Sequence, residues 1–390
     1  MSTITFPVQK RLALYHIGLI ILLSCLNYLN ALSGPFLWDD RPLILENAFL
    51  RTPQPLYTAF TTDYWSFAST RKTSGYYRPL LLLSYRLDTF FWGFRPFGFH
   101  LTNLLLHTLN AVLVYWLACH LLPSARSAWL AALFFAAHPI HTESVSWISG
   151  RTDLIVTLFL LAAFLSFLSL QRGQGRGKGL FLSLLLFCFA LALLAKENAL
   201  VFPLLLLGYR WFFPSQEKRY TLGYAVGGSV TLIILYLGLR FALVGSPVLA
   251  ASNVPFTIRL LTAPKLFVIY LKLLLLPVGL HIQRDILLTP LSHLFTLEAL
   301  LYLLLTLLVL LAACVLRKRF PLAVFAFFWI GVTLLPVLNL LPLRQVLAER
   351  FLYLPSVGFS LLLAFLLFYP LEKGLVKPAV ALGCALLILG

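Results

Sequence analysis

Two adjacent acidic residues, Asp39 and Asp40, are the first that could do chemistry, and they directly follow an apolar segment in the motif Trp38-Asp39-Asp40. Neighbouring carboxylates at a lipid surface repel each other and are poorly solvated, so they need a cation, a metal ion or a substrate as partner. One of them can act as a general base if an acceptor hydroxyl lies within hydrogen-bond reach. A helix cap or a loop turn is the alternative. We interpret Asp39 or Asp40 as the candidate catalytic residue.

Basic residues at the ends of apolar segments are the candidates for binding an anionic group. Arg78 stands in the motif YYRP (76–79), Arg350 stands in AER (348–350), and Lys196 precedes Glu197 between two apolar segments. Guanidinium groups make bidentate contacts with phosphate, and a charged pair at a membrane edge suggests function. The structural alternatives are interfacial anchoring by Arg78 and a salt bridge that closes a turn at Lys196 and Glu197.

Two histidines lie three residues apart in HPIHTE (138–143), which is followed by GRTD (150–153). Histidines near a glutamate can bind a metal ion, but Pro139 breaks the helical spacing and neither a cysteine nor a third histidine is near. A divalent metal ion is therefore possible but not required, and a hydrogen-bonded scaffold is the preferred interpretation. The predicted substrate-binding residues are Arg78, His138, His141, Glu143, Arg151, Asp153, Lys196, Glu197, Glu349 and Arg350.

The composition indicates the environment in which these residues work. Of the 390 residues, 61% are apolar and 11% are charged, whereas soluble domains contain roughly 45–50% apolar and about 25% charged residues. The chain is therefore predicted to be an integral membrane protein. Its net charge of +17 comes from bases between apolar segments, as the positive-inside rule predicts, so we expect no nucleic-acid partner. The five cysteines all lie in apolar segments, which argues against a disulfide framework.

The apolar segments predict an all-α bundle of about eleven membrane-spanning helices, each of about 20 residues. A signal peptide is the alternative for the first segment, but its length favours a retained helix. Residues 263–280 are predicted to form an outer re-entrant or interfacial helix, because a crossing there would place the basic cluster 317–319 outside. The predicted spans are residues 12–32, 101–122, 127–145, 153–170, 179–195, 199–213, 220–243, 294–316, 320–341, 356–370 and 378–390.

The loops gather the polar residues on one side of the membrane. Residues 33–98 are predicted to be the first extracytoplasmic loop, and residues 79–92 within it mix apolar, aromatic and charged side chains as an interfacial helix does. With this topology, all but two of the 13 acidic residues fall outside. Many bases also lie there, although membrane insertion does not require them on that side. We therefore expect a functional site at the extracytoplasmic face.

Six motifs in a fixed order resemble a known family. The chain is similar, over about residues 30–370, to the membrane part of the transmembrane and tetratricopeptide-repeat O-mannosyltransferases, which are placed in the GT-C superfamily. The resemblance implies one GT-C-like transmembrane domain over residues 1–390, and the repeats that normally follow it are not found in this chain. The motifs are FLWDD (36–40) with Asn47, YRP (77–79), His100 with His107, HPIHTE with GRTD, Lys196-Glu197 and AERFLYLPSVGF (348–359).

The resemblance implies a glycosyltransferase that moves a hexose such as mannose from a polyprenyl-phosphate or dolichyl-phosphate donor to a hydroxyl of a protein or glycan. It implies a bacterial cell membrane or an endoplasmic reticulum membrane, with an extracytoplasmic active site. In that superfamily an acidic residue of the first outer loop serves the reaction, which corresponds here to Asp39 or Asp40. A transporter or lipid flippase is the alternative, and it predicts charges near mid-membrane. The grouping of polar residues at one face favours the enzyme.

Overall fold

The computed structural model describes residues 10–68, 74–172, 177–214, 219–245, 254–282, 284, 296–343 and 345–374. Within these residues all regular elements are helical and none is a strand. The α-helices are α1 (Lys10–Tyr28), α2 (Ala48–Arg51), α3 (Pro79–Trp92), α4 (Pro96–Leu121), α5 (Ala125–Ala137), α6 (Thr142–Ser146), α7 (Arg151–Arg172), α8 (Gly177–Ala195), α9 (Phe202–Phe212), α10 (Arg219–Val244), α11 (Phe256–Leu275), α12 (Leu297–Leu316), α13 (Pro321–Leu334) and α14 (Pro355–Glu372).

Seven segments are long and apolar enough to cross a membrane, and they contain α1, α4, α7, α8, α10, α12 and α14. α5 and α13 are shorter apolar helices. These helices confirm the predicted all-α, multi-pass membrane protein. The number of about eleven crossings stays a prediction, because α9 is much shorter than the roughly 20 residues that one crossing needs. The last predicted span, 378–390, lies outside the described residues.

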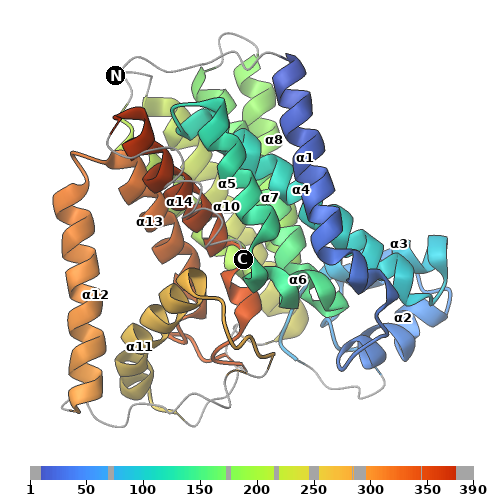
Figure 1. Ribbon diagram of the computed structural model, residues 1–390. Helices are drawn as coiled ribbons and strands as arrows, with labels where there is room; N and C mark the ends of the chain where they lie inside the picture. Colours follow the sequence, from blue (N-terminus) through green and yellow to red (C-terminus); the bar gives the residue numbers. More distant parts are fainter. Residues whose placement is uncertain are drawn as a thin grey trace.

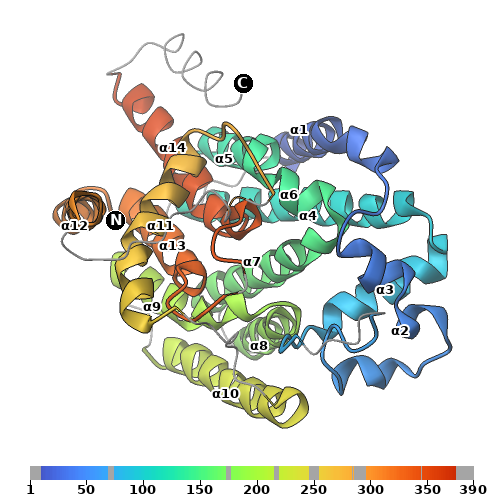
Figure 2. The ribbon, with the colours of Figure 1, turned by 90° about the horizontal axis from the view of Figure 1, so that it is seen from below.

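Small side chains allow the central helices to pack closely. α5 buries Ala128, Ala131, Ala132 and Ala136 at helical spacing, and α4 and α14 pack against it. Membrane helices have no hydrophobic driving force between them, so close backbone approach through small residues supplies much of their attraction. α7 packs against both α4 and α8 at the centre of the bundle (Figures 1 and 2). α7 is therefore a rigid support for the residues at its beginning.

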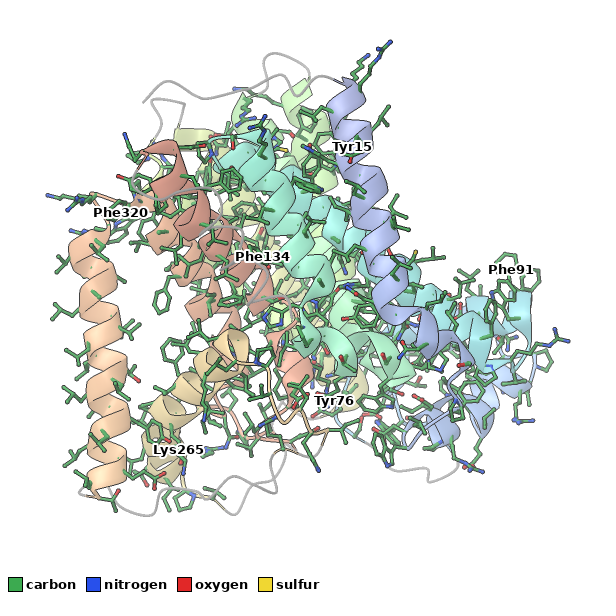
Figure 3. The ribbon with its side chains drawn as sticks, in the orientation of Figure 1. Tyr15, Tyr76, Phe91, Phe134, Lys265 and Phe320 are labelled. Atoms are coloured by element: carbon green, nitrogen blue, oxygen red, sulfur yellow. The ribbon has the colours of Figure 1, made fainter. Side chains whose placement is uncertain are left out.

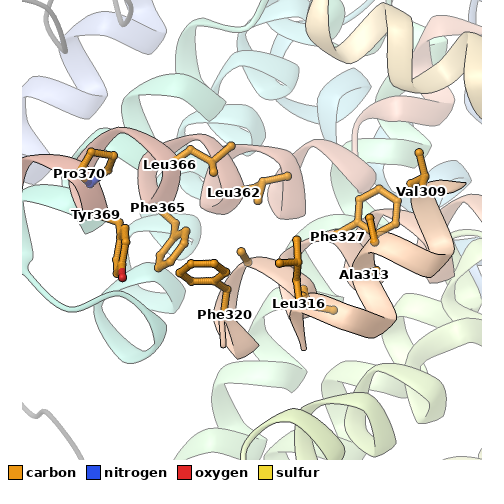
Figure 4. A pocket seen from close by; sticks show the side chains of 13 residues that line it. Val309, Ala313, Leu316, Phe320, Phe327, Leu362, Phe365, Leu366, Tyr369 and Pro370 are labelled. Carbon is orange, nitrogen blue, oxygen red and sulfur yellow. The ribbon is translucent and has the colours of Figure 1, made fainter. Parts of the chain in front are cut away.

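α12 differs from the other long helices because little of its surface is covered by protein. It stands at the left edge of the bundle in Figure 1, and only 6% of its apolar window is buried. A salt bridge of 2.7 Å joins Lys265 Nζ in α11 to Glu298 Oε1 at the beginning of α12. Between α12, α13 and α14 lies an apolar cavity of 380 Å³, where Phe320, Phe365 and Tyr369 form one wall (Figure 4).

α3 has the bounds of the predicted interfacial helix, residues 79–92. It buries Leu81, Tyr85 and Asp88 and exposes Phe90 and Phe91. Phe91 lies at the outer edge of the molecule in Figure 3, to the side of the lower part of the bundle. This division into an inner face and an exposed aromatic face is typical of a helix that lies in the headgroup layer. The helix itself is confirmed with the predicted bounds, and its position at the outer face of the membrane stays a prediction.

α11 follows a course that agrees with the predicted non-crossing segment 263–280. It begins at the lower end of the bundle in Figure 1, and α12 begins at that same end. Its three basic residues, Arg259, Lys265 and Lys272, keep it out of the set of candidate spans. Two successive helices that start from one side are expected when the first of them enters the membrane without crossing it.

The two ends of the bundle differ in charge. The upper end in Figure 1 is basic, and Glu372 is the one acidic residue that the structure describes there. The lower end holds the links α1–α2, α5–α7, α8–α9 and α13–α14, where the acidic residues are concentrated. The basic residues described at the upper end are Lys10, Arg11, Arg126, Arg172, Lys178, Arg210, Arg317, Lys318, Arg319 and Lys373.

Candidate active site

The predicted site residues come from links that are far apart in the sequence, and the fold brings them to the lower end of the bundle. Tyr76, next to the YRP motif, lies in this lower region in Figure 3, whereas Tyr15 and Phe320 lie near the upper end. The links are the loop after α1, the start of α3, α6, the start of α7, the short helix η6 (Glu197–Val201) after α8, and η9 (Glu349–Leu352) before α14.

Asp40 is fixed in place by hydrogen bonds. Its Oδ1 accepts from the backbone N of Ser149 at 2.9 Å and from the Ser149 Oγ at 2.5 Å, and its Oδ2 accepts from the backbone N of Leu37 at 3.0 Å. Only 1% of Asp40 is exposed. Burial raises its pKa to about 6, although the bonds from Ser149 and Leu37 oppose the rise. Asp40 therefore anchors the first loop to the residues that precede α7.

Asp39 has the opposite environment. It is half-buried, and its carboxylate has no hydrogen-bond or ion-pair partner among the residues that the structure describes. Burial raises its pKa above the ordinary value, and the positive charge of Arg350 partly opposes the rise. A carboxylate that remains open to a ligand and lies near a cation suits a general base. The geometry thus distinguishes two residues that the sequence left equivalent.

Arg350 is held beside Asp39 by Glu143 of α6. Its Nη1 donates to the Glu143 Oε1, and its backbone N donates to the Glu143 Oε2 at 2.8 Å. Its Nη2 donates to Gln345 Oε1, and its guanidinium lies 5.3 Å from the centre of the Trp147 ring. The charge of Arg350 is therefore balanced by one carboxylate, and its position is fixed from several sides.

Gly150 explains why α6 can sit so close to the start of α7. A Cβ at this position would lie 2.7 Å from the Glu143 carbonyl oxygen and 2.8 Å from the Ser144 carbonyl oxygen. Both are backbone atoms that cannot rotate away, so a larger residue would push α6 and its Glu143 side chain out of place. The glycine of the GRTD motif is thus a packing requirement of the site.

Lys196 and Asp153 form a buried ion pair. The Lys196 Nζ lies 2.6 Å from the Asp153 Oδ1 and 2.7 Å from its Oδ2, and 5.2 Å from the centre of the Phe351 ring. Burial lowers the pKa of Lys196, Asp153 raises it, and the charges of Arg78 and Arg350 lower it further. Because the charges of Arg78 and Arg350 both act on Lys196, these three cations lie in one region of the site.

Two arginines share Glu197. Arg78 Nη2 lies 3.0 Å from its Oε2, and Arg240 Nη1 lies 2.7 Å from its Oε1. Burial raises the pKa of Glu197, but the two guanidinium groups outweigh it and hold that pKa at about 2. The Nε atoms of Arg78 and Arg240 are buried without a hydrogen-bond partner. This cluster therefore carries one uncompensated positive charge and unused donors, which favours an anion.

Arg151 was predicted to bind substrate, but the structure places its side chain inside the bundle. Its guanidinium pairs with Asp88 at 2.6 Å and donates to Asn103 Oδ1, to the Phe99 carbonyl oxygen and to Ser84 Oγ. It is fully buried, and its hydrogen bonds use three of its five N–H donors, while the carboxylate of Asp88 balances its charge. Arg151 ties α7 to α3 and α4, so we assign it to the scaffold and not to a bound phosphate.

The two histidines also hold the scaffold together. α5 ends at Ala137 because Pro139 has no N–H to continue the helix, so the predicted span 127–145 is interrupted there. His138 Nε2 bonds the Leu274 carbonyl oxygen at 3.0 Å, and His141 Nε2 bonds Ser356 Oγ at 2.7 Å. In the part of the chain that the structure describes, no three His, Cys, Asp or Glu side chains form a group that could hold a metal ion.

A cavity of 230 Å³ opens beside these residues. Trp38, Trp147, Glu143 and Glu349 line it. Arg284 binds the Glu349 Oε1 through Nε at 2.9 Å and through Nη2 at 2.8 Å. Glu349 and Glu143 thus lie in the wall of one cavity, although about 200 residues separate them in the chain.

A larger apolar groove of 700 Å³ runs along the bundle between α9, α11, α12 and α13. Its wall reaches Leu335 and Leu338, which adjoin the short helix η8 (Leu335–Val337), and η8 packs on η6. Because η6 begins with Glu197, the groove reaches the same end of the bundle as the arginine cluster.

Sequence analysis missed two of the arginines in this region. Arg240 lies near the end of α10, where an apolar environment and a single charge are also typical of membrane-edge anchoring. Arg284 stands in a loop without a recognised motif. The isolated charge at the end of an otherwise apolar helix was the available signal for Arg240. Its partner Glu197 was recognised, but a pairing over 43 positions in the sequence is visible only in the folded chain.

The fold and the site define a multi-pass membrane protein with an all-helical bundle and a charged site at one end. A crystal structure of the Archaeoglobus fulgidus oligosaccharyltransferase, tethered with an acceptor peptide, superposes with a TM-score of 0.51 and 15% identity. The match covers 98% of this chain and 54% of that one. At this identity the likeness shows a shared fold.

The sequence comparisons name the proteins that the chain is similar to. The family model of dolichyl-phosphate-mannose-protein mannosyltransferases matches residues 75–264. Protein O-mannosyl-transferase TMTC3 of Mus musculus is 38% identical over 152 residues, which are 39% of this chain and 16% of that protein. Protein O-mannosyl-transferase Tmtc2 of Drosophila melanogaster is 39% identical over 178 residues, which are 44% of this chain and 19% of that protein.

Human protein O-mannosyl-transferase TMTC1 is 42% identical over 147 residues, which are 37% of this chain and 17% of the human protein. The chain therefore spans less than a fifth of the length of these curated relatives. The resemblance predicted from the motifs is confirmed.

Proposed function

We propose that the chain is a membrane glycosyltransferase that moves a mannose-like hexose from a polyprenyl-phosphate donor to a hydroxyl, with a protein Ser or Thr as acceptor. One observation carries the proposal. The open carboxylate of Asp39 lies near the charge of Arg350, at the same end of the bundle as the arginine cluster of Arg78, Arg240 and Glu197. A base and an anion site are the two groups that this transfer needs, and the relatives named above carry the same activity in their names.

In this proposal Asp39 removes the proton from the acceptor hydroxyl as its oxygen attacks the anomeric carbon of the hexose. The new bond joins that oxygen to the anomeric carbon, and the bond from the anomeric carbon to the phosphate oxygen breaks. The electron pair of the broken bond leaves with the polyprenyl phosphate. A single displacement of this kind inverts the anomeric centre.

Arg78 is the residue that we assign to the departing phosphate. Its side chain is 15% exposed, whereas that of Arg240 is 2% exposed, and the two arginines share the counter-ion Glu197. Fixed cations contribute most where negative charge develops in the transition state, because they need no reorganisation. Arg350 and Lys196 are already balanced by Glu143 and Asp153, so they add to the local field more than to direct binding.

The apolar groove between α9, α11, α12 and α13 is the place we propose for the isoprenoid chain. Its volume is 700 Å³, nearly all of its lining residues are apolar, and it reaches the same end of the bundle as the arginine cluster. A lipid in this groove would have its chain in the membrane and its phosphate at Arg78. The lining and the position support this assignment.

We propose that the lower end of the bundle is extracytoplasmic. The basic residues at the upper end, among them the cluster Arg317, Lys318 and Arg319, fit the cytoplasmic side by the positive-inside rule. The described site residues lie at the opposite end. The transporter alternative requires charges near mid-membrane, and the site cluster lies at the helix ends.

Sugar transfer by the purified protein tests this function. The protein in detergent micelles would receive polyprenyl-phosphate mannose with a radiolabelled sugar and a peptide rich in Ser and Thr. We expect label in the peptide and release of one polyprenyl phosphate for each sugar transferred. If the donor binds but the peptide stays unlabelled with several hydroxyl acceptors, the proposed function is wrong.

A further inference from the structure

The backbone at Trp38 holds an indole in an unusual position. Trp38 has a φ of 42°, a region that a bulky non-glycine residue rarely adopts. Two hydrogen bonds between Leu37 and Asp40 hold this turn closed around Trp38. The Leu37 N donates to the Asp40 Oδ2 at 3.0 Å, and the Asp40 N donates to the Leu37 O at 2.9 Å. Strain of this kind persists where the surrounding structure enforces it, and it is concentrated at functional sites.

The strained backbone presents an exposed aromatic side chain to the 230 Å³ cavity. Trp38 is 56% exposed, although it is a large apolar residue, and it lines the cavity. Its ring meets that of Trp147 edge to face, with the ring centres 6.4 Å apart. Trp147 also contacts the guanidinium of Arg350. Two aromatic rings that pack against each other therefore form part of the cavity wall.

The lining of the cavity also offers hydrogen-bond acceptors. Glu143 and Glu349 line it, together with the hydroxyl-bearing residues Thr142 and Ser146. The hydrogen bonds of Glu349 with His281 and Arg284 all use Oε1, so Oε2 has no partner among the residues that the structure describes. Thr142 Oγ1 donates to the Pro139 carbonyl oxygen at 2.8 Å, which leaves its lone pairs for an incoming donor.

These walls select the chemistry of the occupant. The carboxylates of Glu143 and Glu349 are already paired with Arg350 and Arg284, so the wall has no excess of positive charge for a phosphate, and two buried carboxylates disfavour a purely apolar isoprenoid chain. A hexose has several hydroxyl donors for the carboxylates and an apolar face of C–H groups that can lie on an aromatic ring. The cavity is smaller than the roughly 300–1,000 Å³ of sites for larger ligands, so a single sugar ring suits it.

We infer that this cavity is the hexose subsite of the donor and that Trp38 is its sugar-binding residue. The inference rests on the proposed function and adds to it the place and the recognition chemistry of the sugar. The hexose lies on Trp38, with its hydroxyls on Glu143 and Glu349, while Asp39, the next residue in the chain, faces the acceptor. The phosphate then points to the arginine cluster, outside the cavity.

Donor binding with and without the sugar tests the inference. The parent protein, Trp38→Ala, Trp38→Phe and the control Phe91→Ala would be titrated with polyprenyl-phosphate mannose and with polyprenyl phosphate. Phe91 is an exposed aromatic residue on α3, at the edge of the molecule in Figure 3, and it does not line the cavity. We expect Trp38→Ala to bind the sugar-bearing lipid about tenfold more weakly, and Trp38→Phe to recover part of this loss. The binding of polyprenyl phosphate should stay at the parent value in every variant.

Three results would overturn the inference. Equal weakening for both lipids would place Trp38 at the lipid or phosphate and not at the sugar. Parent binding of both lipids by Trp38→Ala, or a change only in the KM of the acceptor, would remove the sugar from this cavity. The parent protein separates the two claims, because sugar transfer by the parent upholds the proposed function whatever Trp38→Ala does.

Discussion

The site at the lower end of the bundle has two regions that differ in their charge balance. In the region of Asp39, Glu143 and Arg350, each fixed cation has its own carboxylate, and Asp39 is an additional one. In the region of Arg78, Arg240 and Glu197, two cations share one carboxylate. The first region therefore has an excess of negative charge and the second an excess of positive charge. This difference suggests a division of labour, with proton removal at Asp39 and phosphate binding at Arg78.

Asp39→Asn should have the largest effect on turnover. The amide keeps the size of the side chain but cannot accept the acceptor proton, and loss of a general base costs about 10²–10⁴-fold in rate. We expect a fall of that size in kcat, measured by the transfer of labelled sugar, while the affinity for the lipid donor stays unchanged. Glu46→Gln is the matched control, because it neutralises an exposed carboxylate of the same loop. A parent rate for Asp39→Asn would move the base to another residue.

Asp40→Asn should instead affect the fold of the loop. An amide would turn an NH₂ group either toward Leu37 N or toward Ser149 N, both of which are donors, so one buried hydrogen bond is lost at about 1–3 kcal/mol. We expect a lower thermal midpoint, with a smaller loss of turnover than in Asp39→Asn. Equal loss of turnover in both variants, with an unchanged midpoint for Asp40→Asn, would contradict the distinction between the two residues.

Arg78→Gln should weaken donor binding by about 10- to 100-fold, because a charge-assisted hydrogen bond contributes roughly 1.5–3 kcal/mol. The effect should appear in the KM of the lipid donor and in the Kd of polyprenyl phosphate. Arg95→Gln removes an exposed positive charge just before α4 and serves as the control. If both variants lose the same affinity, the effect is a general field effect and Arg78 is not a specific phosphate contact.

Arg350→Ala should shift the pH profile by a smaller amount. Burial raises the pKa of Asp39 and Arg350 lowers it, so removal of Arg350 raises that pKa further. A general base works only when deprotonated, and the acid limb of kcat/KM should therefore move to higher pH in Arg350→Ala. Arg350→Lys keeps the charge and should leave the limb near the parent position. A limb that stays in place in Arg350→Ala would show that Asp39 does not set it.

The sequence predicted the fold class and the site motifs because both depend on local patterns. Apolar length predicts a helix that can span the membrane, and the mixture of residues 79–92 predicted the bounds of α3. The roles within the site depend on distant contacts. Asp39 and Asp40 are equivalent in the sequence, and only Ser149, 109 positions later, makes one of them an anchor. Arg151 was predicted to bind an anion because of its residue type and its motif, but its guanidinium is paired with Asp88 and donates a hydrogen bond to Asn103.

The division of labour between the two regions is tested most directly by the binding of polyprenyl phosphate, the lipid without its sugar, to Asp39→Asn and Arg78→Gln in the same titration. We predict that Asp39→Asn binds this lipid at the parent Kd, although its rate of sugar transfer is far below that of the parent. Arg78→Gln should bind the lipid at least tenfold more weakly. If Asp39→Asn loses affinity while Arg78→Gln keeps it, the phosphate lies in the other region and the account is wrong.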